Sequence, residues 1–399
     1  MAYQNVGKPR FYIDYFSYWQ SMGLVHALKS WNWNGNYHDG YFIGLNPSSN
    51  TTLSTGDVLN AEAPEDKFVI AVDLKEAVPS RVLDSINFCG VLGHNINVYS
   101  DEVNGCEIKF ITNQRDAMDS QIGQHTQMGS IIPHDGISDT ESDIEIINAE
   151  KDSTELKVAN SGFSLSKVGF QESSEFIENE IDRFSFRIQW RDPSGYIIGG
   201  ENSDEVISGS WNLNCLTMGH FYDMPVSPDL DVKMEVEFDG YDTAETLGGS
   251  TLSNLRYTGN PKWGNNNAWE IGESSSHYKR NGRRSWSMKF SFISDKDIFS
   301  SNYSSNNWLS NTTDNSDYNS NDDLTSDENN FEYTLADDDS FIAKVLNFVG
   351  NGQRFIFQPD SSNSNPDQFA ICVLDQDSLQ ITQKAFKSYE VALKIREVW

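Results

Sequence analysis

The stretch LDVKMEVEF at residues 230–238 alternates apolar and charged side chains with a period of two. Successive side chains of a β-strand point to opposite faces, so the alternation predicts a strand with one buried and one solvated face. The same period recurs at 184–190, 286–292 and 389–395. Polar outer faces favour antiparallel sheets, because water can cover one side of them. The side chains expected on the buried faces are Phe184, Phe186, Ile188 and Trp190; Leu230, Val232, Met234, Val236 and Phe238; Trp286, Met288, Phe290 and Phe292; and Tyr389, Val391, Leu393 and Ile395.

The composition also favours β-structure. Aromatic residues make up 12% of the chain, and aromatic side chains suit the half-buried face of a pleated sheet. Two helices are expected: Asp14 can cap a short helix that ends near Gly23, and residues 339–349 join acidic residues at the start to an apolar face, with Gly350 following. The sequence therefore predicts a mainly β fold of antiparallel β-sandwich or jelly-roll units with a few short helices.

The length of the chain predicts more than one unit, because a single hydrophobic core stops growing at roughly 250–300 residues and this chain has 399. Residues 135–155 are acidic, and residues 300–330 are mostly Ser, Asn and Asp, which is typical of loops and linkers. We expect a jelly-roll-like β-sandwich over 1–220 that contains the acidic insertion, and a β-rich middle unit over 221–299. A linker over 300–330 then leads to a helix with antiparallel strands over 331–399, which can pack against the middle unit.

The charge of the chain argues against several functions. Its formal net charge is −30, whereas binding to nucleic-acid phosphates needs clustered Lys and Arg. We expect no direct nucleic-acid binding, and the acidity suits either solubility or a surface past which DNA moves without sticking. The first ten residues are polar, and no run of about 18 apolar residues occurs. Cytoplasmic synthesis without membrane insertion is therefore expected.

No pattern of catalytic residues is found in the sequence. The chain lacks the GxxxxGK[ST], HExxH, GxSxG and strand-bound GxGxxG spacings of phosphate binding, zinc hydrolysis, acyl transfer and dinucleotide binding. Its four cysteines form no CxxC pair, so we expect buried free thiols, with a Cys89–Cys106 disulfide as the alternative. We predict no catalytic residue, no metal site and no enzyme activity; a glycosidase-like pair of carboxylates is the competing hypothesis.

Residues 321–328 form the one candidate for a cofactor site. Their carboxylate and amide oxygens are ligands that calcium accepts, but the EF-hand spacing and its turn glycine are missing. We therefore expect no cofactor, with calcium in this segment as the alternative.

The segment SINFCGVLGHNI at 85–96 resembles the strand and LGHN turn of galactose-binding-like jelly-roll domains in phage tail and virion proteins. The resemblance implies that an apolar strand enters a turn at Gly93, His94 and Asn95 and that a second strand leaves it. His94 and Asn95 would then bond to the turn backbone, which is a structural role without a ligand.

Further motifs resemble uncharacterised virion structural proteins of marine tailed bacteriophages. They are GHFYDMP at 219–225, GGSTLSN at 248–254, GRRSW at 282–286 and the closing KIREVW at 394–399. The resemblance implies a structural component of the virion, associated with the tail or baseplate and made in the host cytoplasm. It implies binding to other virion proteins and to copies of itself, for which sheet edges are suitable contacts.

Two groups of residues are candidates for binding. Arg280, Arg283 and Arg284 form a basic cluster in an acidic chain, and arginines can pair bidentately with carboxylates of a neighbouring subunit or of their own chain. Trp31, Trp33 and Tyr37 stand among polar residues and could stack on sugar rings, although packing at sheet edges is the simpler interpretation. A carbohydrate-binding or host-receptor-recognition module, with a surface glycan as ligand, is therefore the alternative function.

Overall fold

The computed structural model has a mainly β fold with a few short helices, which confirms the predicted fold class. The strand pairs between described residues are all antiparallel. The residues that the structure describes are 7–31, 42–45, 51–54, 68–78, 82, 85–93, 105–113, 130–133, 163–171, 182–191, 210–213, 215–237, 241–255, 262–263, 266–267, 283–299, 340–350, 352–363 and 368–398.

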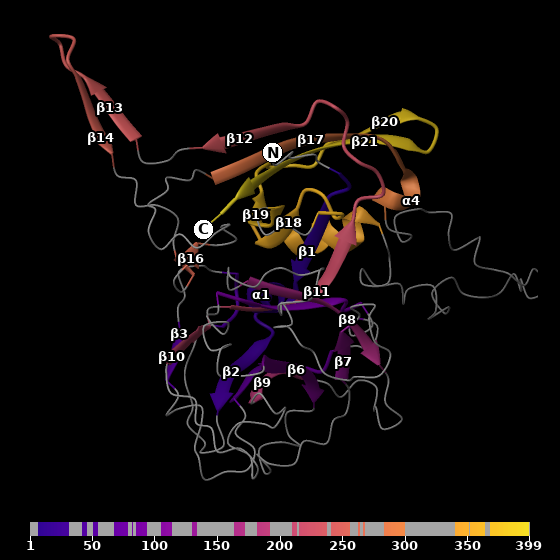
Figure 1. The fold of residues 1–399 in the computed structure, drawn as a ribbon. Coiled ribbons are helices and arrows are strands. Elements are labelled where there is room, and N and C mark those ends of the chain that lie inside the picture. The colour runs from indigo at the N-terminus through magenta and orange to yellow at the C-terminus, as the bar shows by residue number, and fades with distance from the viewer. Residues whose placement is uncertain are drawn as a thin grey trace, which may run out of the picture.

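Most of the described strands belong to one hydrogen-bonded path (Figure 1). In order of pairing they are β12 (Lys233–Glu237), β17 (Arg283–Ser294), β21 (Ser388–Glu397), β19 (Ala370–Leu374), β18 (Phe355–Gln358), β1 (Arg10–Asp14), β11 (Cys215–Asp223), β5 (Phe88–Leu92), β8 (Phe163–Gln171), β7 (Ser130–Pro133), β6 (Gly105–Asn113), β9 (Arg183–Arg191), β4 (Phe68–Leu74) and β2 (Val25–Trp31), with β20 (Ile381–Ala385) pairing β21. Figure 1 shows β12, β17 and β21 at one end, β2, β6 and β9 at the other, and β1 and β11 between them.

The N-terminal strand β1 lies inside this sheet, between strands from distant parts of the chain. It pairs with β11 on one side and with β18 on the other. The backbones of β1 and β11 approach closely at Gly219, where an added Cβ would lie 2.0 Å from the carbonyl oxygen of Ile13. A residue without a Cβ is therefore required at this point, which explains the glycine of the GHFYDMP motif.

Strand β8 changes partners along its length. Residues 163–167 pair with β5, whereas residues 168–171 pair with β7. Beyond β7 and β6, strands β9 and β4 carry a buried ion pair directly across from each other. Arg183 Nε lies 2.6 Å from Asp73 Oδ1 and Arg183 Nη2 lies 2.9 Å from Asp73 Oδ2, with side chains 2% and 0% exposed.

The first predicted helix is confirmed as α1 (Tyr15–Ser21), which directly follows β1. Asp14 accepts hydrogen bonds from the Ser17 amide at 3.0 Å and from the Ser17 hydroxyl, as an N-cap does. The same carboxylate accepts a bond from Thr217 Oγ1 at 3.0 Å. The cap therefore also ties the helix to β11.

The helix predicted at 339–349 is confirmed from residue 341, and residue 339 lies outside the described part. It contains a π-helical turn, η2 (Ile342–Leu346), followed by α7 (Asn347–Val349) and by Gly350 with a φ of 49°. A further short helix, α4 (Asp295–Ile298), follows β17. The side chains that the second helix buries in the core are Phe341, Val345 and Val349.

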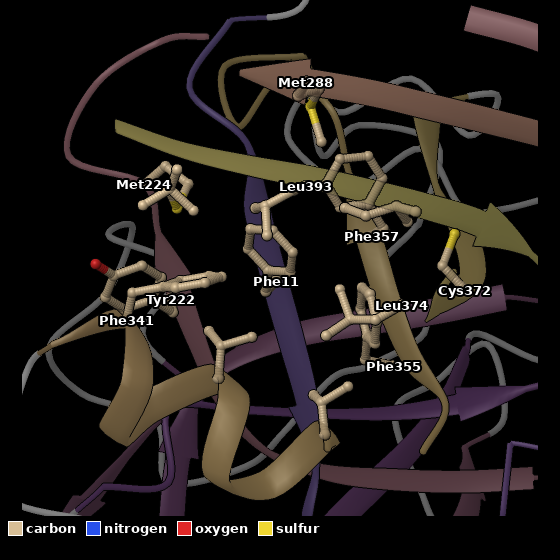
Figure 2. Close-up of a cluster of buried hydrophobic side chains, with 14 of the residues drawn as sticks. Phe11, Tyr222, Met224, Met288, Phe341, Phe355, Phe357, Cys372, Leu374 and Leu393 are labelled. Carbon is tan, nitrogen blue, oxygen red and sulfur yellow. The ribbon is translucent and has the colours of Figure 1, made fainter. Parts of the chain in front are cut away.

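Both faces of β1 are buried in hydrophobic clusters. Phe11 lies in the larger cluster, with its ring centroid 5.3–5.7 Å from those of Phe341, Phe355 and Phe357 (Figure 2). Tyr12 points the other way, into a cluster with Phe88, Leu165, Cys215, Ile356 and Phe369. The described cysteines Cys89, Cys215 and Cys372 are buried free thiols, as the sequence predicts.

The predicted period-two faces agree with β17 and β21 except at one position. Trp286, Met288 and Phe290 are buried as expected, but Phe292 is 77% exposed, so the prediction for Phe292 is wrong. A bulge between Phe290 and Ile293 breaks the period, and Ile293 takes the buried place at 2% exposure. The prediction of a buried face is also wrong in the 230–238 stretch, because Leu230 is fully exposed and Met234 and Val236 of the edge strand β12 are 40% and 42% exposed.

Strands from the three expected units share the sheet. β1 comes from 1–220, β12 and β17 come from 221–299, and β18 to β21 come from 331–399. β17 pairs with β21 over most of its length, from Ser285 to Ser294. The unit boundaries stay a prediction, and residues 135–155 and 300–330 lie outside the described residues.

Three two-stranded sheets complete the described structure. They are β3 (Thr51–Ser54) with β10 (Ser210–Leu213), β15 (Lys262–Trp263) with β16 (Asn266–Asn267), and β13 (Tyr241–Glu245) with β14 (Thr251–Leu255).

Candidate assembly surface

The β13–β14 hairpin, residues 241–255, projects from the body of the protein, and we call it the arm (Figure 1). Its strands pair from Tyr241 opposite Leu255 to Glu245 opposite Thr251. The Thr246 amide donates to the Ser250 carbonyl and the Gly249 amide to the Thr246 carbonyl, both at 2.9 Å. Gly249 has a φ of 78°, which glycine adopts without strain. The glycine pair of the GGSTLSN motif therefore serves a tight turn.

The arm is exposed on both faces. Each residue from 243 to 253 is exposed, and the arm carries Leu247 at 112% and Leu252 at 60% exposure. Among the described strands, β13 and β14 pair only with each other. An isolated two-stranded hairpin is marginally stable in water, so an arm of this kind gains stability when it packs on another surface.

The arm follows the edge strand β12. β12 pairs with β17 on one side and ends the path of described strands on the other. Met234 and Val236 lie on the same face as the buried Trp286 but are 40% and 42% exposed. An edge strand with partly uncovered apolar side chains is a suitable site for pairing with another chain.

Two aromatic rings are exposed at the end of the sheet where β17 ends, one in β17 and one in the β20–β21 turn. Phe292 has a φ of 65°, and Phe386 is 87% exposed in the β20–β21 turn. The two positions belong to the same end of the sheet, because Ile293 pairs with Tyr389. A left-handed backbone costs a bulky residue roughly 1–2 kcal/mol, and burying the ring would be favourable. A strained backbone that holds an apolar ring in water is typical of a binding surface.

Two lysines flank the exposed ring of Phe386. Lys384 Nζ lies 3.2 Å from Glu390 and Lys387 Nζ lies 3.9 Å from Asp295, with 46% and 64% of the lysine side chains exposed. Exposed ion pairs of this kind add little stability. Residues 381–389 contain these two lysines and no acidic residue, and the carboxylates of Glu390 and Asp295 balance the two charges. We call the group of Phe292, Lys384, Phe386 and Lys387 the tip.

The predicted arginine cluster is only partly described. Arg284 forms two bonds to the carboxylate of Glu397, at 2.9 and 3.0 Å, and its Nη2 donates to the Phe369 carbonyl at 2.8 Å. The guanidinium is therefore used within its own chain, one of the two roles that the sequence allowed. Arg283 begins β17, and Arg280 lies outside the described residues. A role for the cluster between subunits stays a prediction.

The other predicted site residues fall largely outside the described part. Trp31 ends β2, but its side chain is not described, and Trp33 and Tyr37 lie outside the described residues. Gly93 follows β5 with a φ of 71°, as a turn residue does. His94, Asn95 and residues 321–328 lie outside the described residues as well. The glycan contacts therefore stay a prediction.

A buried polar network surrounds His220, which is 1% exposed. Its Nδ1 lies 2.8 Å from the Tyr15 hydroxyl, and its Nε2 lies 2.6 Å from the Lys344 carbonyl oxygen in η2. Ser85 Oγ lies 2.6 Å from the Tyr15 hydroxyl and 2.7 Å from the Val82 carbonyl oxygen, and its single proton is donated to one of these two oxygens at a time. The network joins α1, β11 and η2. No sequence signal identifies it, because the partners of His220 lie 205 and 124 residues away.

The protonation of His220 follows from its partners. A carbonyl only accepts, so Nε2 carries the proton that is donated to Lys344. Burial lowers the pKa of His220 to about 3, with the positive charge of Lys344 as a further cause. The ring is therefore neutral at pH 7, and Nδ1 accepts from Tyr15. Burial raises the pKa of Tyr15, so the network consists of uncharged groups and acts as a structural cross-link.

No family model, curated protein or solved structure matches this chain. Within the described ranges, no group of three or more His, Cys, Asp or Glu side chains is arranged to hold a metal ion. The described helices include none with the length and hydropathy to cross a membrane.

Proposed function

We propose that this protein is a structural component of a phage virion, associated with the tail or baseplate, that acts by assembling with copies of itself and with other virion proteins. The observation that carries the assembly role is the exposed arm, with its two solvent-exposed leucines and no partner strand beyond its own hairpin among the described strands. The edge strand β12 and the strained, exposed Phe292 support the same role.

The assignment to a virion rests on the sequence resemblance. In the GHFYDMP motif, Gly219 permits the close approach of β1, and His220 forms the buried cross-link. Tyr222 and Met224 contribute to the larger hydrophobic cluster, and Asp223 forms an ion pair with Arg10 at 2.5 Å. The GHFYDMP motif therefore contributes residues to the central strands and to the hydrophobic core, and this part of the resemblance concerns the fold.

The proposal is tested by the mass and shape of the purified full-length protein. Light scattering over a hundredfold range of concentration, paired with electron microscopy, should give a mass above that of the 45.0 kDa chain and particles of defined symmetry. A protein that stays monomeric at every concentration, in low and physiological salt, would contradict the self-assembly role. Co-purification with viral particles from infected cells then tests the virion assignment separately.

A further inference from the structure

We propose that two copies of this chain pair through the edge strand β12, antiparallel and about a two-fold axis at Met234, so that the sheet continues from one copy into the other. This inference rests on the proposed assembly role and specifies a contact that produces it. It follows from the edge position of β12, the apolar side chains on its core-facing side and the charges on its outer side.

Strand β12 ends the hydrogen-bonded path of the described strands (Figure 1). Its partner among them is β17, on one side. The backbone groups on the other edge of such a strand can pair with a further strand, and natural proteins often prevent this with a charge that points inward. The core-facing residues of β12 are instead Met234 and Val236, at 40% and 42% exposure. The inner side of β12 therefore does not oppose a second strand.

The outer side of β12 carries two exposed side chains of opposite charge, Lys233 and Glu235. Among the described residues, neither lies within 4.0 Å of an oppositely charged group. The charge of Glu235 acts on Lys394, but the Nζ of this lysine lies 2.6 Å from Asp375 and is neutralised there. Lys233 and Glu235 are therefore suited to pairing with a neighbouring chain.

These two charges select one register for an antiparallel pair of β12 strands. With Met234 opposite the same residue of the other copy, each Lys233 lies opposite a Glu235, and Val232 lies opposite Val236. Opposite charges across an antiparallel pair are stabilising, whereas like charges are destabilising. A pair centred on Glu235 or on Lys233 would place that residue opposite its own copy. The register centred on Met234 is therefore favoured.

The remaining side chains are compatible with this register. It brings Asp231 close to Glu237 of the other copy, but the carboxylate of Glu237 is already held by Arg396 of its own chain at 2.8 Å. On the inner side, the apolar strip of one copy extends that of the other across the axis at Met234. Burial of apolar surface is favourable, so the pairing covers side chains that a single copy exposes.

The pairing also places the arms. Each arm follows the end of β12 at Glu237, and the two strands of an antiparallel pair end on opposite sides. The arms therefore leave the pair at its two ends, where they can contact further copies or other proteins. The contact itself is isologous and closes on two copies, so we expect the dimer to be the smallest assembly.

Charge reversals test the register. Lys233→Glu and Glu235→Lys each turn two attractive pairs into two repulsive ones, so each should weaken dimerisation at least about tenfold in light scattering. The double variant restores both pairs and should dimerise about as well as the wild type. Lys75→Glu and Glu76→Lys are the matched controls, because both residues are exposed and follow β4, far along the path from β12.

The two reversals also separate the local contact from the overall charge. They change the net charge of −30 in opposite directions. If general repulsion between acidic copies governed association, Glu235→Lys would strengthen it, whereas the β12 pairing predicts that both reversals weaken it.

A cysteine at the axis gives a second test. Met234→Cys should form a disulfide between copies on mild oxidation, because opposite residues of an antiparallel pair have Cα atoms about 4.5–5.5 Å apart, within disulfide range. Val236→Cys is the control of similar exposure, since its two copies lie four residues apart along the strands, roughly 13 Å. The wild type, whose described cysteines are buried, gives the background.

Circular dichroism and the melting temperature confirm the fold of each variant before association is measured. Wild-type assemblies that persist unchanged in both reversals, or that respond to them in opposite directions, would overturn the β12 pairing while the assembly role stands. A disulfide in Val236→Cys but not in Met234→Cys would do the same. A wild type that stays monomeric would overturn both proposals.

Discussion

Replacing His220 by phenylalanine should destabilise the protein by an amount that depends on pH. The phenylalanine ring can keep the aromatic contacts of His220 with Tyr15 and Phe348, whose ring centroids lie at 5.3 and 5.2 Å. The substitution removes the hydrogen bonds to Tyr15 and to the Lys344 carbonyl. Leaving two buried polar groups without these bonds costs about 1–3 kcal/mol each, so we expect a loss of about 3 kcal/mol at pH 7.5.

The pH dependence follows from the lowered pKa of His220. The folded protein keeps the ring neutral down to a pKa of about 3, whereas the unfolded chain binds a proton at about pH 6.5. Below pH 6.5 the unfolded state therefore binds more protons, and stability falls with falling pH. From pH 7.5 to 5.5 this residue should remove about 1.4 kcal/mol from the wild type and nothing from the variant. The cost of His220→Phe should then fall to about 1.6 kcal/mol.

Urea unfolding followed by tryptophan fluorescence, at pH 7.5 and 5.5, measures this difference while staying above the isoelectric point of about 4.4. Tyr15→Phe is the control, because it breaks the same network at a group that does not titrate in this range, so its cost should be nearly constant. A cost of His220→Phe that is equal at the two pH values, or larger at pH 5.5, would show that His220 is charged in the folded protein and would refute the reasoning.

Three further variants test the fold and the tip. Gly219→Ala should destabilise the protein by about 3 kcal/mol or more, because its Cβ would lie 2.0 Å from the Ile13 carbonyl oxygen; a melting temperature close to that of the wild type would contradict this close approach. Asp73→Ala should cost about 3–5 kcal/mol in urea unfolding, because it removes the carboxylate that forms a buried ion pair with Arg183, and Asp73→Glu serves as the charge-preserving control. Phe292→Gly should stabilise the isolated protein by up to about 1 kcal/mol through relief of the positive φ but weaken assembly in light scattering; reduced stability would show that Phe292 is not strained.

The sequence predicts the parts of the fold that depend on local patterns. Period-two alternation identifies β9, β17 and β21, and the capping aspartate Asp14 identifies the start of α1. Residues 341–349 are helical as their apolar spacing and Gly350 predict, although the π-helical turn inside this helix has no evident signal. These features are predictable because neighbouring residues determine them.

The remaining features depend on residues that are distant in sequence. In the sequence, β1 is a short and largely apolar segment with no pattern that identifies its partners. Its position between β11 and β18 is determined by tertiary pairing. The bulge that exposes Phe292 shifts one residue of an otherwise regular alternation, so the pattern predicts the wrong face. The arm contains the GGSTLSN motif, but the sequence does not indicate that the hairpin projects from the body. The tip is likewise formed from β17 and the β20–β21 turn, which only the fold brings together.

Hydrogen exchange compared between dilute and concentrated protein tests the central claim, that this chain assembles through its arm, most directly. The amides of β13 and β14 hydrogen-bond only within the arm among the described strands, so they should exchange rapidly in dilute protein. At concentrations that give assemblies by light scattering, these amides should become protected. Assemblies in which the arm exchanges as fast as in the dilute protein, with new protection elsewhere on the surface, would contradict the account.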